Sequence, residues 1–393
     1  MATDRYSLRE NNEQLVLTAL IEQPAISRAK ISKLLGLNKA TVSDIANKLI
    51  DNQFILEIGN GDSTTSGGRK PILLQINKQA GLTLTIDLGY DYLSYLVTYL
   101  NGEVVEKVTV PILINQSNCV ELIQQTLLKA THLAEDAPYG IVHITIAVHG
   151  IVNNNRIIFT PYYDLDQMDL HEQLTKQIHL PISIENEANL SVLAERTFST
   201  MVSNLVSISV HSGVGAGIIV NGELYHGRDG RSGEIGHTIL YPHGKDCPCG
   251  NKGCLEQYCS QKAVLSSLQQ LKNKSSLTLE DLVALYQAGD KESLHLVEQF
   301  ATYMSIGINN AIASYGPEKI FLNSTLIQEI PELLPLIKEN MKSSFSLETP
   351  IECSTLAEKA ILLGGAALSI QHFFHLSTLP LISQEDHLLD RPV

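Results

Sequence analysis

Four residues able to bind a metal ion lie within eighteen positions of one another near the middle of the chain. His237 is followed by Cys247, Cys249 and Cys254, and two glycines between the last two cysteines permit a tight turn. Three thiolates and one imidazole are a ligand set of tetrahedral structural zinc sites. The spacing therefore predicts a Cys3His zinc site. Disulfides are the weaker alternative because no secretory signal is expected, and unliganded thiols are the other.

Two carboxylates flank this cluster. Glu234 precedes His237 by three residues, so the two side chains share a face on a turn or helix start, and Glu256 follows Cys254 by two. A metal-bound imidazole presents its other ring nitrogen in a fixed direction. Carboxylates and an imidazole together suit a ligand rich in hydroxyl groups. The alternative is that both glutamates are solvated surface charges.

Charge is unevenly distributed along the 393 residues. The net charge is −14, yet the first 80 residues hold 10 basic against 8 acidic side chains, so only this segment is expected to approach nucleic acid. The length exceeds that of one typical domain and predicts two or three, and a hydrophobic content of 44% is ample for their cores. No apolar run approaches the ~20 residues of a membrane helix, so we expect a cytoplasmic protein.

The N-terminal segment has the pattern of a DNA-binding helix pair. A helix is expected over 7–23; Ser27 then caps a short helix, Gly36 supplies a turn, and Asn38 caps another. Two helices joined at a glycine are typical of a helix-turn-helix. Lys39, Thr41 and Ser43 at the start of the second helix are predicted to reach base edges and phosphates.

Two strands follow, at 54–58 and 71–76, and the loop between them ends in Arg69 and Lys70. Together they resemble the wing of a winged helix, with both cations beside the DNA backbone or minor groove. We therefore expect a winged helix-turn-helix domain over 1–76. The alternative for the helix pair alone is an ordinary helical hairpin.

A linker at 77–80 and an α/β body over 81–393 are expected next. Strands are predicted at 82–88, 92–100, 104–110, 141–148 and 320–322, and helices at 120–133, 263–271, 279–287, 293–315, 330–341 and 361–374. Gly364 and Gly365 would allow the last helix to pack closely.

Several motifs together carry a family resemblance. They are Leu37-Asn-Lys-Ala-Thr-Val-Ser43, Ser66-Gly-Gly-Arg-Lys-Pro71, Glu185-Asn-Glu-Ala-Asn189, Ser232-Gly-Glu-Ile-Gly-His237 and the cysteine cluster. The chain resembles the ROK family of bacterial sugar kinases and sugar-responsive repressors, and within it is similar to the xylose repressors. The resemblance implies an actin-like (ribonuclease H-like), duplicated α/β body in two lobes, and a homodimer that reads a two-fold operator.

The resemblance also implies a sugar site. The catalytic aspartate of the family's kinases falls at Glu187, beside Asn186, and Glu234, His237 and Glu256 complete the implied set. Xylose is the favoured effector. The roles of His149 and of the tyrosines that follow Pro161 stay open: Tyr162 or Tyr163 would stack on the sugar or fill the pocket.

Kinase chemistry is expected to be lost. Phosphoryl transfer needs small residues around the phosphates, but the first loop reads Asp87-Leu-Gly-Tyr90-Asp91, and Phe321-Leu-Asn-Ser324 replaces a glycine-rich adenosine loop. We therefore expect a sugar-responsive repressor without enzymatic activity. The alternatives are an ATP-dependent sugar kinase, or a regulator that answers a different sugar or a partner protein.

Overall fold

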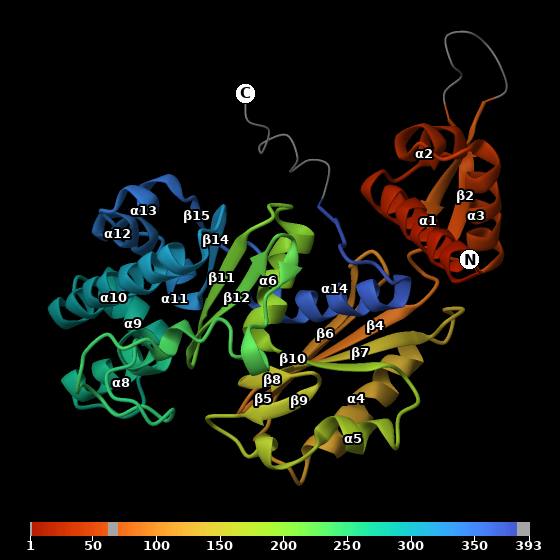
Figure 1. Cartoon of the computed structure of the whole chain (residues 1–393). Coiled ribbons are helices and arrows are strands. Elements are labelled where there is room, and N and C mark those ends of the chain that lie inside the picture. Colours follow the sequence, from red (N-terminus) through yellow and green to blue (C-terminus); the bar gives the residue numbers. More distant parts are fainter. Residues whose placement is uncertain (1, 62–69, 383–393) are drawn as a thin grey trace.

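The computed structural model describes residues 2–61 and 70–382. Figure 1 shows an N-terminal unit, called the head below, and two α/β lobes with a long helix between them. Among the described residues, no helix is long and apolar enough to cross a membrane.

The head contains three helices and a small sheet. The helices are α1 (Ala2–Glu22), α2 (Arg28–Leu35) and α3 (Lys39–Asp51); the strands β1 (Ile26–Ser27), β2 (Ile55–Asn60) and β3 (Ile72–Ile76) pair in the order β1-β3-β2. Both predicted caps are present: Ser27 accepts from the Lys30 amide at 3.3 Å and Asn38 from the Thr41 amide at 2.8 Å. Gly36 has a φ of 67°, as the turn requires.

The first lobe is built on a five-stranded sheet. β4 (Leu82–Leu88), β5 (Tyr92–Tyr99) and β6 (Val104–Pro111) form an antiparallel meander, and β7 (Ile141–Val148) and β10 (Ile182–Asn186) extend it in parallel. Helices α4 (Cys119–Leu133) and α5 (Leu170–Thr175) cover it, and β8 (Ile151–Asn153) pairs with β9 (Arg156–Phe159) outside it.

The second lobe repeats this arrangement. β11 (Leu205–Val210), β12 (Val214–Val220) and β13 (Glu223–Leu224) form the meander, with β14 (Lys319–Asn323) and β15 (Ile351–Cys353) added in parallel. Counted from each lobe's first strand, both sheets have the same strand order. This confirms the duplicated α/β body that the resemblance implied.

Helices of the second lobe match most of the predicted ranges. They are α7 (Glu256–Cys259), α8 (Gln261–Lys272), α9 (Leu279–Gln287), α10 (Lys291–Tyr315), α11 (Thr325–Glu329), α12 (Leu333–Asn340) and α13 (Ser344–Glu348). The helix predicted over 330–341 begins only at Leu333. Pro331 explains the difference, because the residue before a proline is disfavoured in the helical region.

Two helices join the lobes to each other and to the head. α6 (Glu187–Phe198) packs against α14 (Ala360–Phe374), and a Cβ at Gly364 would overlap the Leu190 carbonyl, which confirms the predicted close packing. The last turns of α14 share a hydrophobic core with the head, and Ala80, within the predicted linker, is buried in it. The head is thus packed onto the body.

Candidate functional site

The four predicted metal ligands converge in the second lobe. Their ligand atoms all lie within 4.8 Å of one another, with Cys249 Sγ 3.7 Å from Cys254 Sγ and Cys247 Sγ 3.5 Å from His237 Nδ1. A tetrahedral ion with bonds of ~2.3 Å to sulfur and ~2.0–2.1 Å to nitrogen separates such atoms by about 3.8 and 3.6 Å. The side chains therefore fit a zinc-sized ion.

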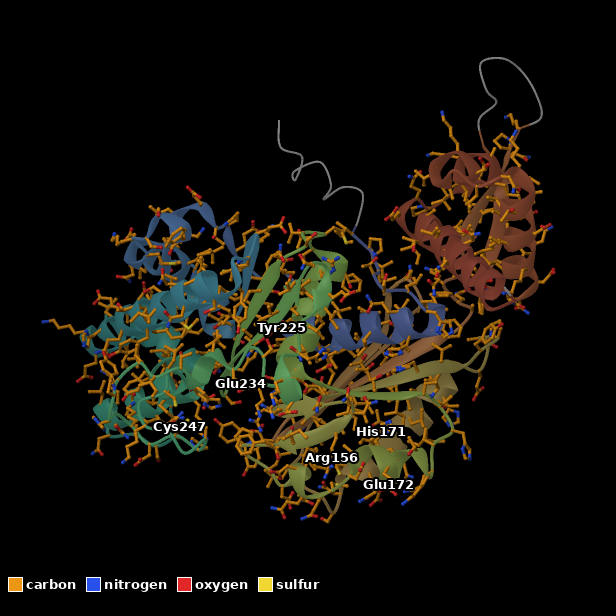
Figure 2. All side chains as sticks on the ribbon, viewed as in Figure 1. Arg156, His171, Glu172, Tyr225, Glu234 and Cys247 are labelled. Carbon is orange, nitrogen blue, oxygen red and sulfur yellow. The ribbon has the colours of Figure 1, made fainter. Side chains whose placement is uncertain are left out.

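His237 connects this cluster to a cavity. Its Nδ1 faces the sulfur atoms, whereas its Nε2 lies 3.6 Å from Glu234 Oε2. Both residues belong to the turn around the short 3-10 helix Ile235–His237, which explains their shared face. Figure 2 shows Glu234 beside the gap between the lobes and Cys247 farther out on the second lobe.

Glu256 lies at the N-terminus of α7 and is only 7% exposed. Its Oε2 accepts a hydrogen bond from the Val214 amide at 3.2 Å, and a Cβ at Gly213 would crowd the same oxygen. The glycine-rich β11–β12 turn therefore admits this carboxylate. The interpretation of Glu256 as a solvated surface charge is wrong.

Asn186 and Glu187 approach from the first lobe, at the junction of β10 and α6. Asn186 caps α6 by accepting from the amides of Ala188 and Asn189 at 2.9 and 3.0 Å. Its Nδ2 donates to Glu187 Oε2 at 2.7 Å and to the Gly150 carbonyl at 2.8 Å. Burial raises the pKa of Glu187 to about 7, although the charge on His149 opposes the shift.

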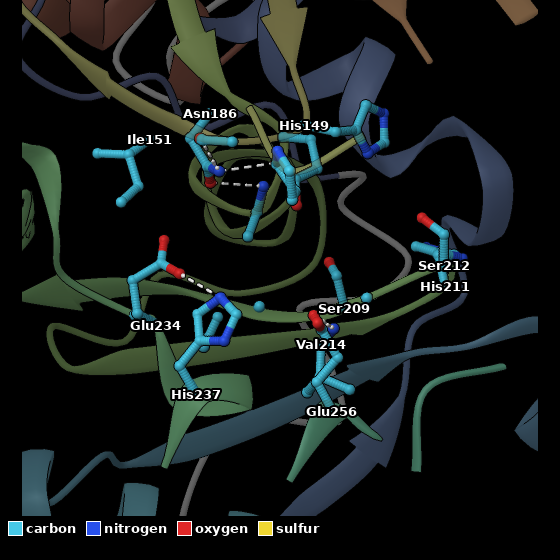
Figure 3. A pocket seen from close by; sticks show the side chains of 18 of the residues that line it. His149, Ile151, Asn186, Ser209, His211, Ser212, Val214, Glu234, His237 and Glu256 are labelled. Carbon is cyan, nitrogen blue, oxygen red and sulfur yellow. Dashed lines mark hydrogen bonds and ion pairs between the residues drawn. The ribbon is translucent and has the colours of Figure 1, made fainter. Parts of the chain in front are cut away.

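All five predicted sugar residues line one cavity between the lobes, which encloses about 680 Å³ of empty space including its mouth. Figure 3 shows Asn186 and His149 on one side of it and Glu234, His237 and Glu256 on the other. Two further wall residues, Ser209 and Ser232, were missed from the sequence. Among the described residues, their hydroxyl oxygens are buried and have no hydrogen-bond partner. Ser209 is a single serine in β11 and gives no sequence signal, whereas Ser232 begins the motif that ends at His237 and could have been found from it.

His149 belongs to a charged cluster at one end of this cavity. Its Nε2 lies 2.9 Å from Asp87 Oδ1, and the Tyr92 hydroxyl donates to Asp87 Oδ2 at 2.9 Å. Burial by itself disfavours the charged ring, but the charge and hydrogen bond of Asp87 and the charge of Glu187 outweigh it, so the pKa of His149 rises to about 9. His149 is thus paired with Asp87 and also lines the cavity.

A tyrosine ring covers part of the loop after Asp87. Tyr90, expected to obstruct phosphate there, is 50% exposed, and the side chain packed on the loop is Tyr92, whose ring would overlap a Cβ at Gly89. Tyr163 is buried, with its hydroxyl donating to the Leu88 carbonyl at 2.7 Å. Tyr162 instead lines the cavity.

Four of the five predicted DNA-contacting residues, Lys39, Thr41, Ser43 and Lys70, are among the described residues and lie on the head, away from the cavity (Figure 1). Lys39 is exposed, and Thr41 and Ser43 are half-buried in the first turns of α3. Lys70 is exposed just before β3, whereas Arg69 lies outside the described residues.

Comparison with known proteins agrees with these features. The ROK family model matches residues 83–372. The chain is 34% identical to a xylose repressor of Bacillus subtilis, over 96% of this chain and 99% of that protein, and 36% identical to one of Staphylococcus xylosus, over 94% and 96%. A crystal structure of a ROK family transcriptional regulator, a homologue of the E. coli Mlc protein, superposes with a TM-score of 0.78 and 28% identity over 93% of this chain and 96% of that one.

The chain therefore belongs to the ROK family, with that family's actin-like α/β fold. Within the family its similarity extends over nearly the full length of repressors, and it is a sugar-responsive transcriptional repressor rather than an enzyme.

Proposed function

We propose that this protein represses xylose-utilisation genes and that D-xylose, bound in the cavity between the lobes, releases it from its operator. The similarity to xylose repressors supports the choice of sugar. The observation that carries the proposal is the cavity itself, which is lined by the predicted carboxylates and by Ser209 and Ser232, two residues whose buried hydroxyls have no partner among the described residues.

The chemistry of the wall suits a small uncharged sugar. Glu187, Glu234 and Glu256 accept hydrogen bonds from sugar hydroxyls, and such bonds to charged groups are the stronger kind. The serine hydroxyls both donate and accept. Among the described residues no Lys or Arg lines this cavity, which disfavours a phosphorylated sugar as the effector.

The cysteine cluster is proposed to hold one structural Zn²⁺ per chain through His237, Cys247, Cys249 and Cys254. The ion would fix the tautomer and direction of the His237 ring, so that Nε2 faces Glu234 and the sugar. Metal analysis by mass spectrometry is expected to give one zinc per chain. Cys249→Ser should lower zinc content and sugar affinity together.

The head is proposed to be a winged helix-turn-helix domain over 1–76, with 77–80 as the connection to the sugar-binding body over 81–393. Lys39, Thr41 and Ser43 would enter the major groove, and Arg69 and Lys70 would contact the DNA from the wing. A homodimer would present two heads to a palindromic operator.

The packing of α6 and α14 suggests how sugar binding in the cavity could change DNA binding by the head. Glu187 begins α6, α6 packs against α14, and the last turn of α14 contacts the head through Phe373 and Phe374. Closure of the lobes on a sugar would shift α6 and α14, and with them the head. To move the equilibrium substantially, the sugar must favour the closed state by a few kcal/mol, on the order of two hydrogen bonds to charged groups.

Fluorescence anisotropy on DNA upstream of the protein's own gene tests the proposal, at fixed salt and with D-xylose, D-glucose and N-acetylglucosamine. We expect D-xylose to release the protein from the DNA. Glu187→Ala and Glu256→Ala should abolish this release without weakening DNA binding in the absence of sugar. Release by D-xylose that survives both substitutions would refute the site. If none of the three sugars changes DNA binding, the proposed effector class is refuted.

A further inference from the structure

The cavity proposed to hold the sugar shares a wall with a larger outer cavity. The outer cavity encloses about 1800 Å³ of empty space, open to solvent, between the Asp87 loop and α8. Both cavities are lined by the same five residues: His149, Pro161, Tyr162, His211 and Ser212. Tyr162 has the largest side chain of the five and lines both spaces.

The Tyr162 ring is held from the opposite lobe. Tyr162 follows β9 in the first lobe, whereas Lys262 lies in α8 of the second. The Lys262 Nζ is 4.4 Å from the centre of the Tyr162 ring, within the range of a cation–π contact. This contact therefore spans the mouth of the cleft and fixes the ring across it.

The neighbouring tyrosine anchors the loop that carries the ring. The Tyr163 hydroxyl donates to the Leu88 carbonyl at 2.7 Å and accepts from the His149 amide at 3.1 Å. Because these contacts hold Tyr163 in the first lobe, they fix the backbone beside it, and the neighbouring Tyr162 lies at the cavity. The sequence alone did not distinguish the two tyrosines, but their contacts do.

We propose that Tyr162, positioned by Lys262, contacts the sugar and limits its size. This inference rests on the proposed function. The apolar face of the ring suits the C–H face of a pyranose, as aromatic side chains combine an apolar body with a polar tip. On this proposal the exocyclic carbon of a hexose, when directed at Tyr162, would meet the ring, whereas the pyranose form of a pentose has no such carbon. Removal of the ring joins the inner space to the outer cavity.

Isothermal titration calorimetry of the full-length protein with D-xylose and D-glucose tests this. Tyr162→Ala should weaken D-xylose binding by about two- to tenfold, the range for an aromatic contact, and raise the ratio of D-glucose to D-xylose affinity. Tyr162→Phe keeps the ring and should keep the wild-type ratio. Lys262→Gln should weaken D-xylose affinity by about two- to fivefold, and Lys262→Arg, which retains a cation, should keep the wild-type affinity.

Circular dichroism spectra and thermal midpoints of each variant confirm that it is folded. An unchanged glucose-to-xylose ratio in a folded Tyr162→Ala protein would overturn the size limit. A Lys262→Arg variant as impaired as Lys262→Gln would overturn the positioning role. If wild-type protein binds neither sugar, the proposed function fails and this inference with it. If the wild-type protein binds D-xylose but Tyr162→Ala leaves the ratio of D-glucose to D-xylose affinity unaltered, this inference fails and the proposed function stands.

Discussion

Phe54 of the head and Phe373 of α14 meet edge to face, with ring centroids 5.4 Å apart. Phe374 and Tyr139 pack against the same Phe54 ring at 5.8 and 5.1 Å. This aromatic group lies at the end of α14, the helix that packs on α6, and α6 begins at Glu187 in the cavity between the lobes. It is therefore the place where a movement of α14 would reach the head.

We expect Phe54→Ala to reduce the coupling between sugar and DNA. The variant should bind D-xylose normally in the absence of DNA, but the factor by which the sugar weakens operator binding should fall toward one. By thermodynamic reciprocity, the factor by which operator DNA weakens sugar binding should fall equally. Anisotropy and calorimetry measure the two factors separately.

Phe345→Ala is the matched control for this prediction. Phe345 is 72% exposed on α13, at the far end of the second lobe from the head (Figure 1). Its removal should leave both factors unchanged. Full coupling in folded Phe54→Ala protein would mean that the signal reaches the head by another route.

Removal of the Ser209 hydroxyl should have opposite effects on the stability of the sugar-free protein and on its affinity for D-xylose. A buried hydroxyl without a partner costs about 1–3 kcal/mol, which a sugar hydroxyl would recover. Ser209→Ala is therefore expected to leave the sugar-free protein as stable or more stable, while D-xylose affinity falls by roughly tenfold or more. Chemical denaturation and calorimetry measure the two effects.

Ser207 provides the comparison on the same strand. It lies two residues before Ser209 in β11, is equally buried, and its hydroxyl pairs with that of Ser191 at 3.2 Å. Ser207→Ala should lower the free energy of unfolding by about 1 kcal/mol and leave sugar affinity unchanged. A loss of stability in Ser209→Ala similar to that in Ser207→Ala would argue against an unpartnered hydroxyl.

The sequence was most informative where structure is decided locally. The caps at Ser27 and Asn38 and the turn at Gly36 depend on neighbouring residues, and all three are confirmed. The duplicated fold and the sugar set came from the family motifs, because Glu187 and Glu256 are separated by 68 intervening residues. The partners of Tyr92 and Lys262, and the place of Ser209 in the cavity wall, depend on contacts between distant strands, helices and lobes, which no local pattern encodes.

The ion pair of His149 and Asp87 should make stability depend on pH. The pKa of His149 is raised from an ordinary 6.5 to about 9, so the folded protein binds more protons than the unfolded chain between these values. The stabilisation is complete below pH 6.5 and is lost as the pH rises to 9. A shift of this size corresponds to roughly 3 kcal/mol.

Asp87→Asn removes the charge that pairs with His149. The free energy of unfolding should then change less between pH 6.5 and 9. Urea denaturation of both proteins from pH 6 to 9.5 gives the comparison, and the difference between them reports the contribution of Asp87, which acts on His149 and, to a smaller extent, on Glu187. Parallel profiles would show that Asp87 does not hold the proton on His149.

The head should bind DNA through separable phosphate and base contacts. Lys39 and Lys70 are exposed cations of the predicted DNA-binding face. Each Lys→Ala change should weaken operator and unrelated DNA alike and lower the slope of log affinity against log salt by about 1. Ser43→Ala should instead weaken binding to the operator selectively and leave the salt slope unchanged, because a base contact releases no counterion.

Lys274→Ala is the control for these predictions. Lys274 is an exposed cation of the second lobe, and the slope of this variant should equal that of the wild type. If Lys274→Ala lowers the slope as much as Lys39→Ala does, the DNA lies on the body and the assignment of the head is wrong.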